Sequence, residues 1–430
     1  MFRVYVQFRY KQLMYILKRW LLKATALAAI ATFVSGCLTV CWTVMLIPLC
    51  LVGVIFLPFY LVMLPIYYAN EGAPDTFGVQ QIAVAPDGRS IAGTVLENGK
   101  TRLVRFPVEG ESTPILLTDG NHSDFDPVYT PSGDSLLFAR NTGRDESNLF
   151  AMEPDGSNLR QLTHTKGNLW GVNLSKDGQW AVFSYSEKGK QADIHLLNLV
   201  TLERLTVTND EDSHDINPIL LEDGETILFA RGTWFGHYSP IAASAWHDFD
   251  LFTVQKDGTD LRQLTRQSSY GTSRMERTSD RNRVLYSYGG FVSLEDGQIA
   301  DILPKGIRYT VLSETDLPVN DPGRFRISRD GKRLAFLMSE ETSEGKDIDT
   351  LHIMDVEDQT PREIARHESI HSVSWMPSGD AVAFTSSRSI TKTQQRLELW
   401  LAMVDGSPPR RLDYALESGS EEKEHRDEDE

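Results

Sequence analysis

The stretch Thr130-Pro131-Ser132-Gly133-Asp134-Ser135-Leu136-Leu137-Phe138 is one copy of the pattern that decides the fold of this chain. A polar turn that ends in glycine is followed by two polar residues and then by an apolar triplet. The seven copies, aligned on the turn glycine, lie at Gly88, Gly133, Gly178, Gly224, Arg281 (which replaces the glycine), Gly331 and Gly379. A spacing of roughly 45 to 57 residues predicts an array of similar supersecondary units.

Each copy predicts four antiparallel strands. Apolar residues alternate before the turn, as in Val373 and Trp375, and an apolar triplet follows it, so the two segments predict a hairpin. A third apolar run (Leu149–Met152) and a short fourth segment that ends in Leu162-Thr163 complete the unit. Such units bury both of their faces when they are packed radially, which predicts the blades of a β-propeller.

The predicted fold class is therefore all-β, a β-propeller of four-stranded antiparallel blades over residues 76–415. Seven blades are favoured, and six are the alternative, because the fifth copy (about residues 273–321) has lost its turn glycine. The first copy begins with an inner strand and the last ends with an outer strand near Arg410–Tyr414. We therefore expect little strand exchange at the closure of the ring.

A membrane anchor is predicted ahead of the propeller. Residues 1–23 form a basic N-terminal segment, and residues 24–70 form a hydrophobic segment in which residues 24–68 contain no Asp, Glu, Lys or Arg. A bilayer crossing needs about 20 apolar residues, so one or two transmembrane helices fit, with a break near Pro48.

The sequence leaves the side of the membrane open. Basic residues precede the apolar segment and Glu71 follows it, which favours a cytoplasmic N-terminus and a propeller on the extracytoplasmic, periplasmic side. A two-helix hairpin would instead return the propeller to the cytoplasm. Val34-Ser35-Gly36-Cys37 resembles a bacterial lipoprotein processing box and makes Cys37 a candidate lipidation site, although an ordinary helix residue is favoured because a long apolar stretch follows.

The net charge of the chain excludes nucleic acids as partners. The formal net charge is -17, and nucleic-acid binding requires a basic face. Residues 416–430 are strongly acidic and are expected to be a disordered tail.

Two short motifs resemble catalytic signatures but are explained by the repeat. His367-Glu368-Ser369-Ile370-His371 matches the zinc-peptidase pattern, which requires a helix, whereas here it precedes a predicted strand at a junction between blades. Gly133-Asp134-Ser135-Leu136 resembles an esterase block but consists of the turn and the first strand residue. We therefore predict no catalytic residue, no cofactor and no metal.

Two groups of residues form the candidate binding surface. One is polar and lies in the connections between blades, where the alternative role is turn capping and contact between blades. The other is aromatic and lies in a long loop predicted between Arg231 and Asp248, where the side chains either pack as a small core or are displayed to a partner. The candidates are His122, Asp124, Asp126, Asp212, His214, Asp215, Trp234, Phe235, His237, Tyr238, Trp246, His247, Glu368 and His371.

The turn and strand at Tyr129–Phe138, with Asp155-Gly156 and Leu162-Thr163 farther along, resemble the TolB-like β-propeller repeat family. The resemblance covers about four fifths of the chain. It implies scaffold or binding work in the cell envelope, and the same repeat occurs in propellers that gate prolyl-oligopeptidase-type hydrolases. No α/β domain is recognised before the repeats and no hydrolase domain after them, so TolB's partner-binding residues are not carried over.

These observations predict a membrane-tethered, non-catalytic propeller that acts as a protein-protein interaction or scaffold module, with a protein or peptide at the mouth of the propeller. The alternative is a subunit that senses a peptide or sugar, or regulates an enzyme, with its ligand in the propeller channel. The sequence contains no complete catalytic constellation, which favours the first hypothesis.

Overall fold

The computed structural model describes residues 75–413, except 98, 110–112, 236–244, 270–274, 279, 287–289, 302–324, 342–346, 359 and 392–393. The predicted basic segment 1–23, the hydrophobic segment 24–70 with Cys37, and the tail 416–430 lie outside these residues, as do His237 and Tyr238. Over the residues that are described, the structure contains no helix of the length and apolarity that a membrane crossing needs.

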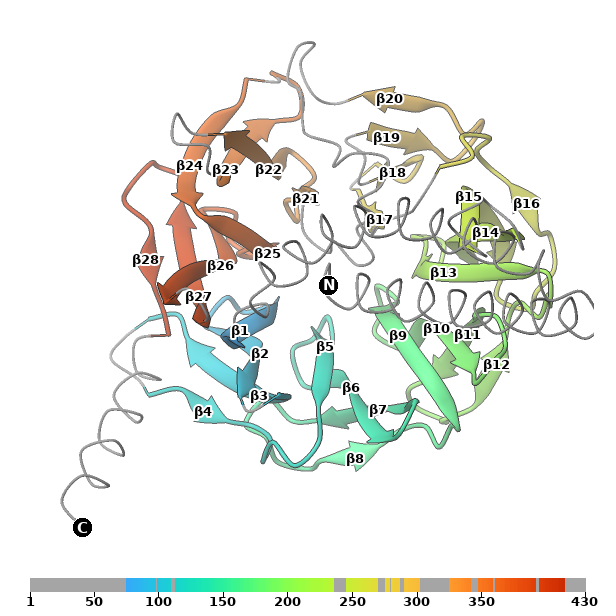
Figure 1. Cartoon of the computed structure of the whole chain (residues 1–430). Helices are drawn as coiled ribbons and strands as arrows, with labels where there is room; N and C mark the ends of the chain where they lie inside the picture. Colours follow the sequence, from blue (N-terminus) through green and yellow to red (C-terminus); the bar gives the residue numbers. More distant parts are fainter. Residues whose placement is uncertain are drawn as a thin grey trace, which may run out of the picture. The chain divides into compact units, whose positions relative to one another are not determined.

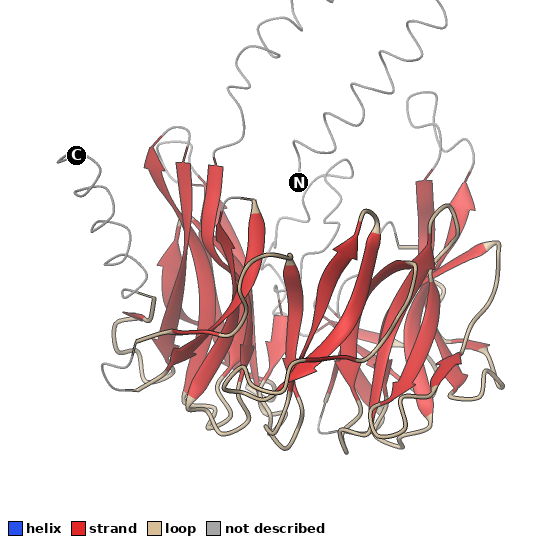
Figure 2. Ribbon diagram, turned by 90° about the horizontal axis from the view of Figure 1, so that it is seen from below, coloured by secondary structure: helices blue, strands red, loops and turns tan. Residues whose placement is uncertain are grey.

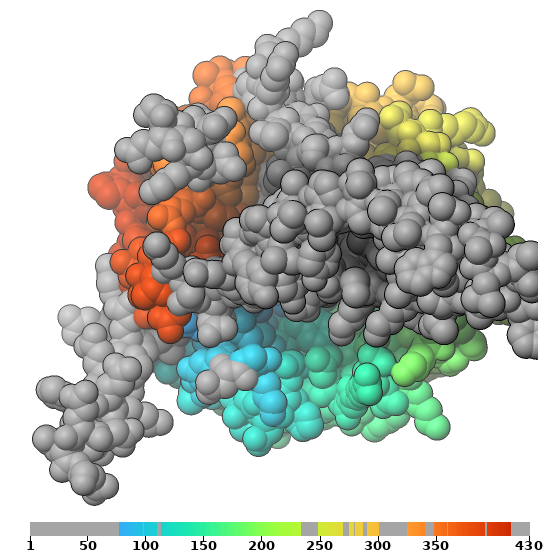
Figure 3. Space-filling view, in the orientation of Figure 1, coloured from blue at the N-terminus to red at the C-terminus, as the bar shows by residue number. Residues whose placement is uncertain are grey.

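The described residues form seven successive groups of four strands (Figure 1). The strands are β1 (Asp75–Val84), β2 (Ser90–Glu97), β3 (Lys100–Pro107), β4 (Ile115–Leu116), β5 (Asp124–Tyr129), β6 (Leu136–Gly143), β7 (Glu146–Met152), β8 (Arg160–Gln161), β9 (Gly167–Leu174), β10 (Trp180–Glu187), β11 (Asp193–Asn198), β12 (Arg204–Thr206), β13 (Ser213–Leu220), β14 (Thr226–Phe235), β15 (Ala245–Gln255), β16 (Arg262–Gln263), β17 (Met275–Arg277), β18 (Arg283–Tyr286), β19 (Gly290–Ser293), β20 (Ile299–Asp301), β21 (Phe325–Ile327), β22 (Arg333–Glu341), β23 (Asp347–Asp355), β24 (Arg362–His367), β25 (Ser369–Trp375), β26 (Ala381–Thr391), β27 (Gln394–Met403) and β28 (Arg410–Arg411). The coloured atoms of Figure 3 follow the ring in chain order.

The sheets confirm an all-β propeller of four-stranded antiparallel units. Five groups form separate four-stranded sheets, namely β5–β8, β9–β12, β13–β16, β17–β20 and β21–β24. The first and last groups are joined in one eight-stranded sheet, because β27 pairs with β1. The prediction of seven or six separate blades is therefore wrong, since five four-stranded blades stand alone. The expectation of little strand exchange at the ring closure is wrong for the same reason.

The turns behave as the repeat predicts. Gly133 has a φ of 82°, which favours glycine, and its amide donates to the carbonyl of Thr130 at 2.9 Å. The block around Gly133 is thus a turn, as predicted. In the fifth copy, where Arg281 replaces the glycine, the turn has a different hydrogen bond. The amide of Arg283 donates to the carbonyl of Asp280 at 3.2 Å.

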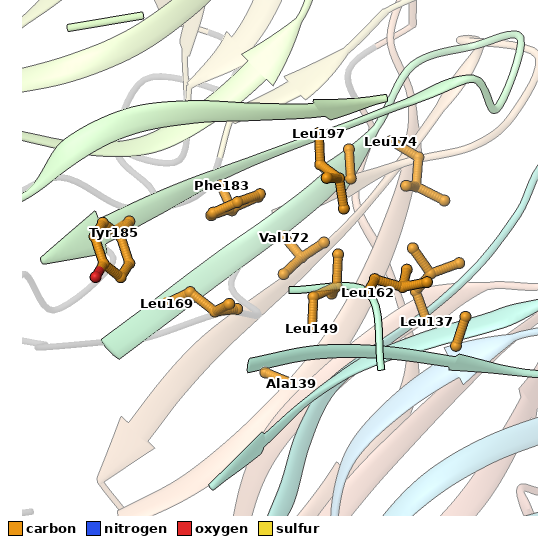
Figure 4. Close-up of a cluster of buried hydrophobic side chains, with 12 residues drawn as sticks. Leu137, Ala139, Leu149, Leu162, Leu169, Val172, Leu174, Phe183, Tyr185 and Leu197 are labelled. Carbon is orange, nitrogen blue, oxygen red and sulfur yellow. The ribbon is translucent and has the colours of Figure 1, made fainter. Parts of the chain in front are cut away.

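Hydrophobic clusters fill the boundaries between neighbouring groups of strands. The phenylalanine that ends the apolar triplet is fully buried in five copies, and burying such a side chain contributes about 1.5–3 kcal/mol. Figure 4 shows the cluster between β5–β8 and β9–β12, with Tyr185 at one end of the row and Leu174 near the other. The buried phenylalanines are Phe138, Phe183, Phe229, Phe336 and Phe384.

Figure 2 shows the longer strands running between the two faces of the ring, with short turns gathered on the lower side in that view. We call the face that carries the turns at Gly88, Gly133 and Gly178 the turn face. The opposite face carries the hairpin connections β2–β3, β6–β7, β10–β11 and β14–β15, and β1 begins there. We call this second face the hairpin face.

Candidate functional site

Two of the predicted acidic candidates are buried in ion pairs. Asp124 is fully buried and accepts from Arg140 Nε at 2.6 Å and Nη2 at 2.9 Å. Asp215 is fully buried and accepts from Arg231 Nε at 2.8 Å and Nη2 at 2.7 Å. Each arginine also lies over two phenylalanine rings of its own sheet. These carboxylates hold strands together and are not presented to a ligand.

Asp126 connects three inner strands. It accepts from Gln81 Nε2 at 2.9 Å, and its own amide donates to Gln81 Oε1 at 2.8 Å. Its second carboxylate oxygen accepts from the amide of Gly171 at 3.1 Å. The side chain therefore links β1, β5 and β9, as the turn-and-contact alternative predicts.

His214 is held in the neutral form. Burial lowers its pKa to about 4, and its Nδ1 accepts from the amide of Ala192 at 3.1 Å. Its ring lies 6.5 Å from the ring of Trp170. His214 thus contributes to the contact between β11 and β13.

The remaining polar candidates are exposed and widely separated along the ring. His122 Nδ1 lies 3.2 Å from the carbonyl oxygen of Asn141, and the amide of Asp212 donates to Asp210. Glu368 accepts from the amide of Ser389 at 3.2 Å, and His371 is exposed on β25. The structure does not bring the predicted polar candidates together at one site.

The zinc-like motif spans the junction between β24 and β25, and β25 begins three residues earlier than predicted, at Ser369. His367 ends β24, its Nδ1 lies 3.1 Å from Ser386 Oγ, and its ring packs on Phe384 and Trp400. His371 lies on β25, a different strand. Within the described part of the chain, no three His, Cys, Asp or Glu residues are grouped so that they could hold a metal.

The aromatic segment is more regular than predicted. We expected an irregular loop from Arg231 to Asp248, but β14 continues to Phe235 and β15 already begins at Ala245. Trp234 pairs with Trp246, and His247 pairs with Thr233. The predicted bounds of the loop are wrong, because backbone pairing between β14 and β15 continues to Phe235 and Ala245. Residues 236–244 lie outside the described residues.

A pocket that the sequence did not indicate lies where β8 and β9 meet β10–β12. It has a volume of about 460 Å³, and we call it the Tyr185 pocket. Residues 162–166 connect β8 to β9, and the other lining residues come from β10, β11, β12 and the turn before β12, so no local motif contains them together. They are Leu162, Thr163, His164, Thr165, Lys166, Tyr185, Glu187, Leu197, Leu202 and Arg204.

Positive charge and an aromatic hydroxyl characterise the Tyr185 pocket. The Arg204 guanidinium lies 5.1 Å from the centre of the Tyr185 ring, and His195 meets that ring edge-on at 5.0 Å. Burial raises the pKa of the Tyr185 hydroxyl, so it stays protonated at neutral pH. Arg204 and Lys166 are exposed. Besides Lys190, the charge of Arg204 also lowers the pKa of Glu187, which lines the same pocket.

Glu187 and Leu202 also line this pocket. Glu187 is paired with Lys190 at 2.8 Å, and hydrogen bonding from Lys190 lowers the pKa of Glu187. Leu202 is 43% exposed and has a φ of 61°, which is uncommon for a leucine. Strained residues cluster at functional sites, and this one lies on the rim of the pocket.

A second pocket of about 430 Å³ lies between β13–β16 and β17–β20. Glu222, Asp223 and Asp260 give it an acidic lining, beside Arg262 and Arg281. The Arg262 guanidinium is already hydrogen-bonded within the protein, because it donates to the backbone carbonyls of Leu294 and Glu295. This pocket offers a ligand less free positive charge than the Tyr185 pocket does.

No protein-family model matches the chain. Over 179 residues it is 27% identical to an uncharacterized protein of Agrobacterium fabrum, a match that covers 40% of this chain and 53% of that protein. The chain thus spans about half the length of this curated relative.

Solved structures resemble the propeller more broadly. Puromycin hydrolase matches with a TM-score of 0.54 at 16% identity, covering 79% of this chain and 53% of that chain. An oligogalacturonate lyase in complex with manganese matches with a TM-score of 0.53 at 15% identity, covering 76% and 89%. TolB from Acinetobacter baumannii matches with a TM-score of 0.40 at 16% identity, covering 81% and 66%. At these identities the likeness establishes the fold, that of a β-propeller with TolB-like proteins among its structural neighbours.

The comparisons correct the predicted function. We predicted a non-catalytic interaction module, or a sensing or regulatory subunit, because the sequence contained no catalytic constellation. The neighbours with TM-scores above 0.5 include a lyase and a hydrolase, which are enzymes. These neighbours contradict the prediction of a non-catalytic module.

Proposed function

We propose that the protein is a propeller enzyme that binds an acidic oligosaccharide in the Tyr185 pocket and cleaves it. One observation carries the proposal. Arg204 and Lys166 line the same cavity as Tyr185 and His164, and both cations are exposed.

The two cations suit a sugar carboxylate. Arginine binds carboxylates with a planar, two-pronged donor set, and Lys166 adds a point charge. The apolar surfaces of Leu197, Leu202 and Tyr185 suit the hydrophobic faces of sugar rings. The volume lies within the range of roughly 300–1,000 Å³ that is typical of ligand sites.

The residues that line the Tyr185 pocket can catalyse a β-elimination. A base removes the proton from the carbon next to the carboxylate, the glycosidic oxygen leaves the adjacent carbon with its bonding electrons, and a carbon–carbon double bond forms. The leaving oxygen takes up a proton, so the reaction needs no co-reactant. We assign the base to His164, the acid to Tyr185 and carboxylate neutralisation to Arg204.

The comparison with the lyase supports this proposal in one respect. That match covers 89% of the lyase chain, so a protein that is mostly propeller can be an enzyme. The manganese of that lyase is not carried over, because the described residues offer no group of three metal ligands.

The test uses the full-length protein with oligogalacturonate, and a neutral galacto-oligosaccharide as the control ligand. We expect the ultraviolet absorbance of the unsaturated product to rise only with the acidic sugar. Arg204→Gln should abolish both binding and cleavage, whereas Arg160→Gln, an exposed arginine outside the pocket, should change neither. Absence of both binding and product with the acidic sugar would refute the proposal.

We also propose that residues 24–68 anchor the protein in a membrane, with the propeller on the extracytoplasmic side. The length of the apolar segment and the basic residues before it support this assignment. Protease treatment of intact spheroplasts should degrade the propeller, and its protection would overturn the assignment of side.

A further inference from the structure

The second pocket lies beside the one repeat whose turn glycine is replaced. Six copies of the repeat have glycine at this turn position, and the fifth copy has Arg281. Arg281 is exposed and lines the cavity of about 430 Å³ between β13–β16 and β17–β20, which we call the Arg281 pocket. The irregular copy therefore brings a guanidinium group to a cavity, where the repeat pattern alone would place a glycine.

The residues on either side of Arg281 form the hydrogen bonds of this turn. The Asp280 carboxylate accepts from the amide of Asn282 at 2.9 Å and from Arg283 Nε at 2.6 Å. The Arg283 guanidinium also lies 5.0 Å from the centre of the Phe291 ring. The adjacent carboxylate is thus paired with Arg283, and the Arg281 side chain lines the pocket instead.

The Arg281 pocket is separate from the Tyr185 pocket. It opens on the turn face, because the β13–β14 turn contributes residues 221–223 and the β17–β18 turn contributes Arg281. Figure 1 shows β13–β16 and β17–β20 next to each other in the ring. No residue lines both pockets. A ligand of the Arg281 pocket is therefore independent of what the Tyr185 pocket binds or cleaves.

Two carboxylates of the Arg281 pocket are exposed to a positively charged group. Glu222 is already paired with Lys176 at 2.5 Å, whereas Asp223 and Asp260 are exposed. Although burial alone would raise the pKa of Asp223, hydrogen bonds from Thr226 and from turn amides lower it. The Asp223 carboxylate therefore stays charged at neutral pH.

Two guanidinium groups and two leucines complete the part of the lining that matters for a small ligand. Arg262 is fixed by its bonds to backbone carbonyls, so it adds positive charge at a set position. Arg281 can bind a carboxylate with a planar, two-pronged donor set. Leu221 and Leu294 add apolar surface. The pocket thus presents groups of both charges to one ligand.

We propose that the Arg281 pocket binds a free α-amino acid, with the ligand carboxylate on Arg281 and its ammonium group on the carboxylates of Asp223 and Asp260. An α-amino acid carries one charge of each sign, which matches the charges of this lining. The volume lies at the lower end of the range of roughly 300–1,000 Å³ that is typical of ligand sites, so it suits a small ligand. Thr253 and Gln255 also line the pocket and can hydrogen-bond a polar side chain of the ligand.

The experiment measures the binding of L-glutamine to the full-length protein by isothermal titration calorimetry. N-acetyl-L-glutamine lacks the ammonium charge and the α-amide of L-glutamine lacks the carboxylate, so each should bind about tenfold more weakly or less. Arg281→Gln should weaken the binding of L-glutamine by a similar factor. Arg329→Gln is the matched control, because Arg329 is an exposed arginine of the β21–β22 turn outside the pocket, and it should leave the affinity unchanged.

Three results would overturn the proposal. They are no binding of L-glutamine, an affinity that Arg281→Gln leaves unchanged, and equal affinities for L-glutamine and its N-acetyl derivative. Arg281→Gly restores the glycine of the other copies, so this variant tests the loss of binding even if Arg281→Gln is poorly folded. Cleavage of oligogalacturonate is measured separately, so failure of either site leaves the other to stand on its own result.

Discussion

A Cβ atom at Gly78 would lie 2.1 Å from the carbonyl oxygen of Leu397. The close approach brings β1 of the first group against β27 of the last group, and this pairing joins the two into one sheet. Gly78 also has a φ of 105°, a conformation that residues with side chains rarely adopt. One glycine thus permits the closure of the ring.

Gly78→Ala should destabilise the propeller. Backbone strain of order 1–3 kcal/mol and overpacking of a similar size act at the same position. Urea unfolding followed by tryptophan emission measures the change. Gly99→Ala is the matched control, because Gly99 has a φ of 76° but nothing within 4 Å of the added Cβ. Equal losses of unfolding free energy in the two variants would show that the contact with Leu397 does not contribute to stability.

The stability of the propeller should respond differently to single and to double substitution of the Asp124–Arg140 pair. Removing one member leaves a buried charge unpaired, which costs about 3–5 kcal/mol, so we expect Arg140→Tyr alone to be strongly destabilising. The register of the next sheet places Leu169 opposite Tyr185 where β5 and β6 have Asp124 opposite Arg140. The double variant Asp124→Leu with Arg140→Tyr copies that apolar pair and should recover most of the loss. A double variant that is less stable than either single variant would contradict this account.

The same pair shows why the fold was easier to predict from the sequence than the site. Turn residues and apolar triplets are local, so the pattern around Gly133 predicted the strands directly. Asp124 was interpreted as a ligand-binding residue because its partner, Arg140, lies across the turn on another strand. The Tyr185 pocket combines Thr163–Lys166, Tyr185 and Arg204, which meet only after β9–β12 have formed. Closure through β27 was missed because it depends on the contact of Gly78 with a strand more than 300 residues away in the chain.

Asp193 should make the propeller less stable as the pH rises. Burial raises its pKa from 3.8 to about 6, so between these values the folded protein binds more protons than the unfolded chain. Stability contributed by the protonated form is therefore present below about pH 4 and is lost as the pH rises through about 6. Asp193→Asn should raise the melting temperature at pH 8 and leave it nearly unchanged at pH 4. Asp145→Asn, an exposed control, should change neither, and an Asp193→Asn protein that melts lower at pH 8 would contradict the assignment.

His214 acts in the opposite direction over an overlapping range. Burial lowers its pKa to about 4, so the unfolded chain binds the extra proton between about pH 4 and 6.5. Its contribution is fully present above about pH 6.5 and is lost as the pH falls through about 4. His214→Gln should flatten the acid side of the stability profile, as melting temperatures measured from pH 4 to pH 7 would show. An unchanged slope would mean that His214 is not neutral in the folded protein.

Tyr185→Phe separates binding from catalysis in the Tyr185 pocket. The variant keeps the ring beneath Arg204 but removes the hydroxyl, whose raised pKa keeps it protonated and able to donate. Loss of a general acid costs roughly 10²-fold or more in rate, so we expect kcat for oligogalacturonate to fall by that factor while the affinity stays nearly constant. Tyr129→Phe is the control, because burial also raises the pKa of Tyr129 but its hydroxyl lies outside the pocket. If kcat stays the same in both variants, Tyr185 is not the acid. If the affinity falls as much as kcat does, its hydroxyl serves binding alone.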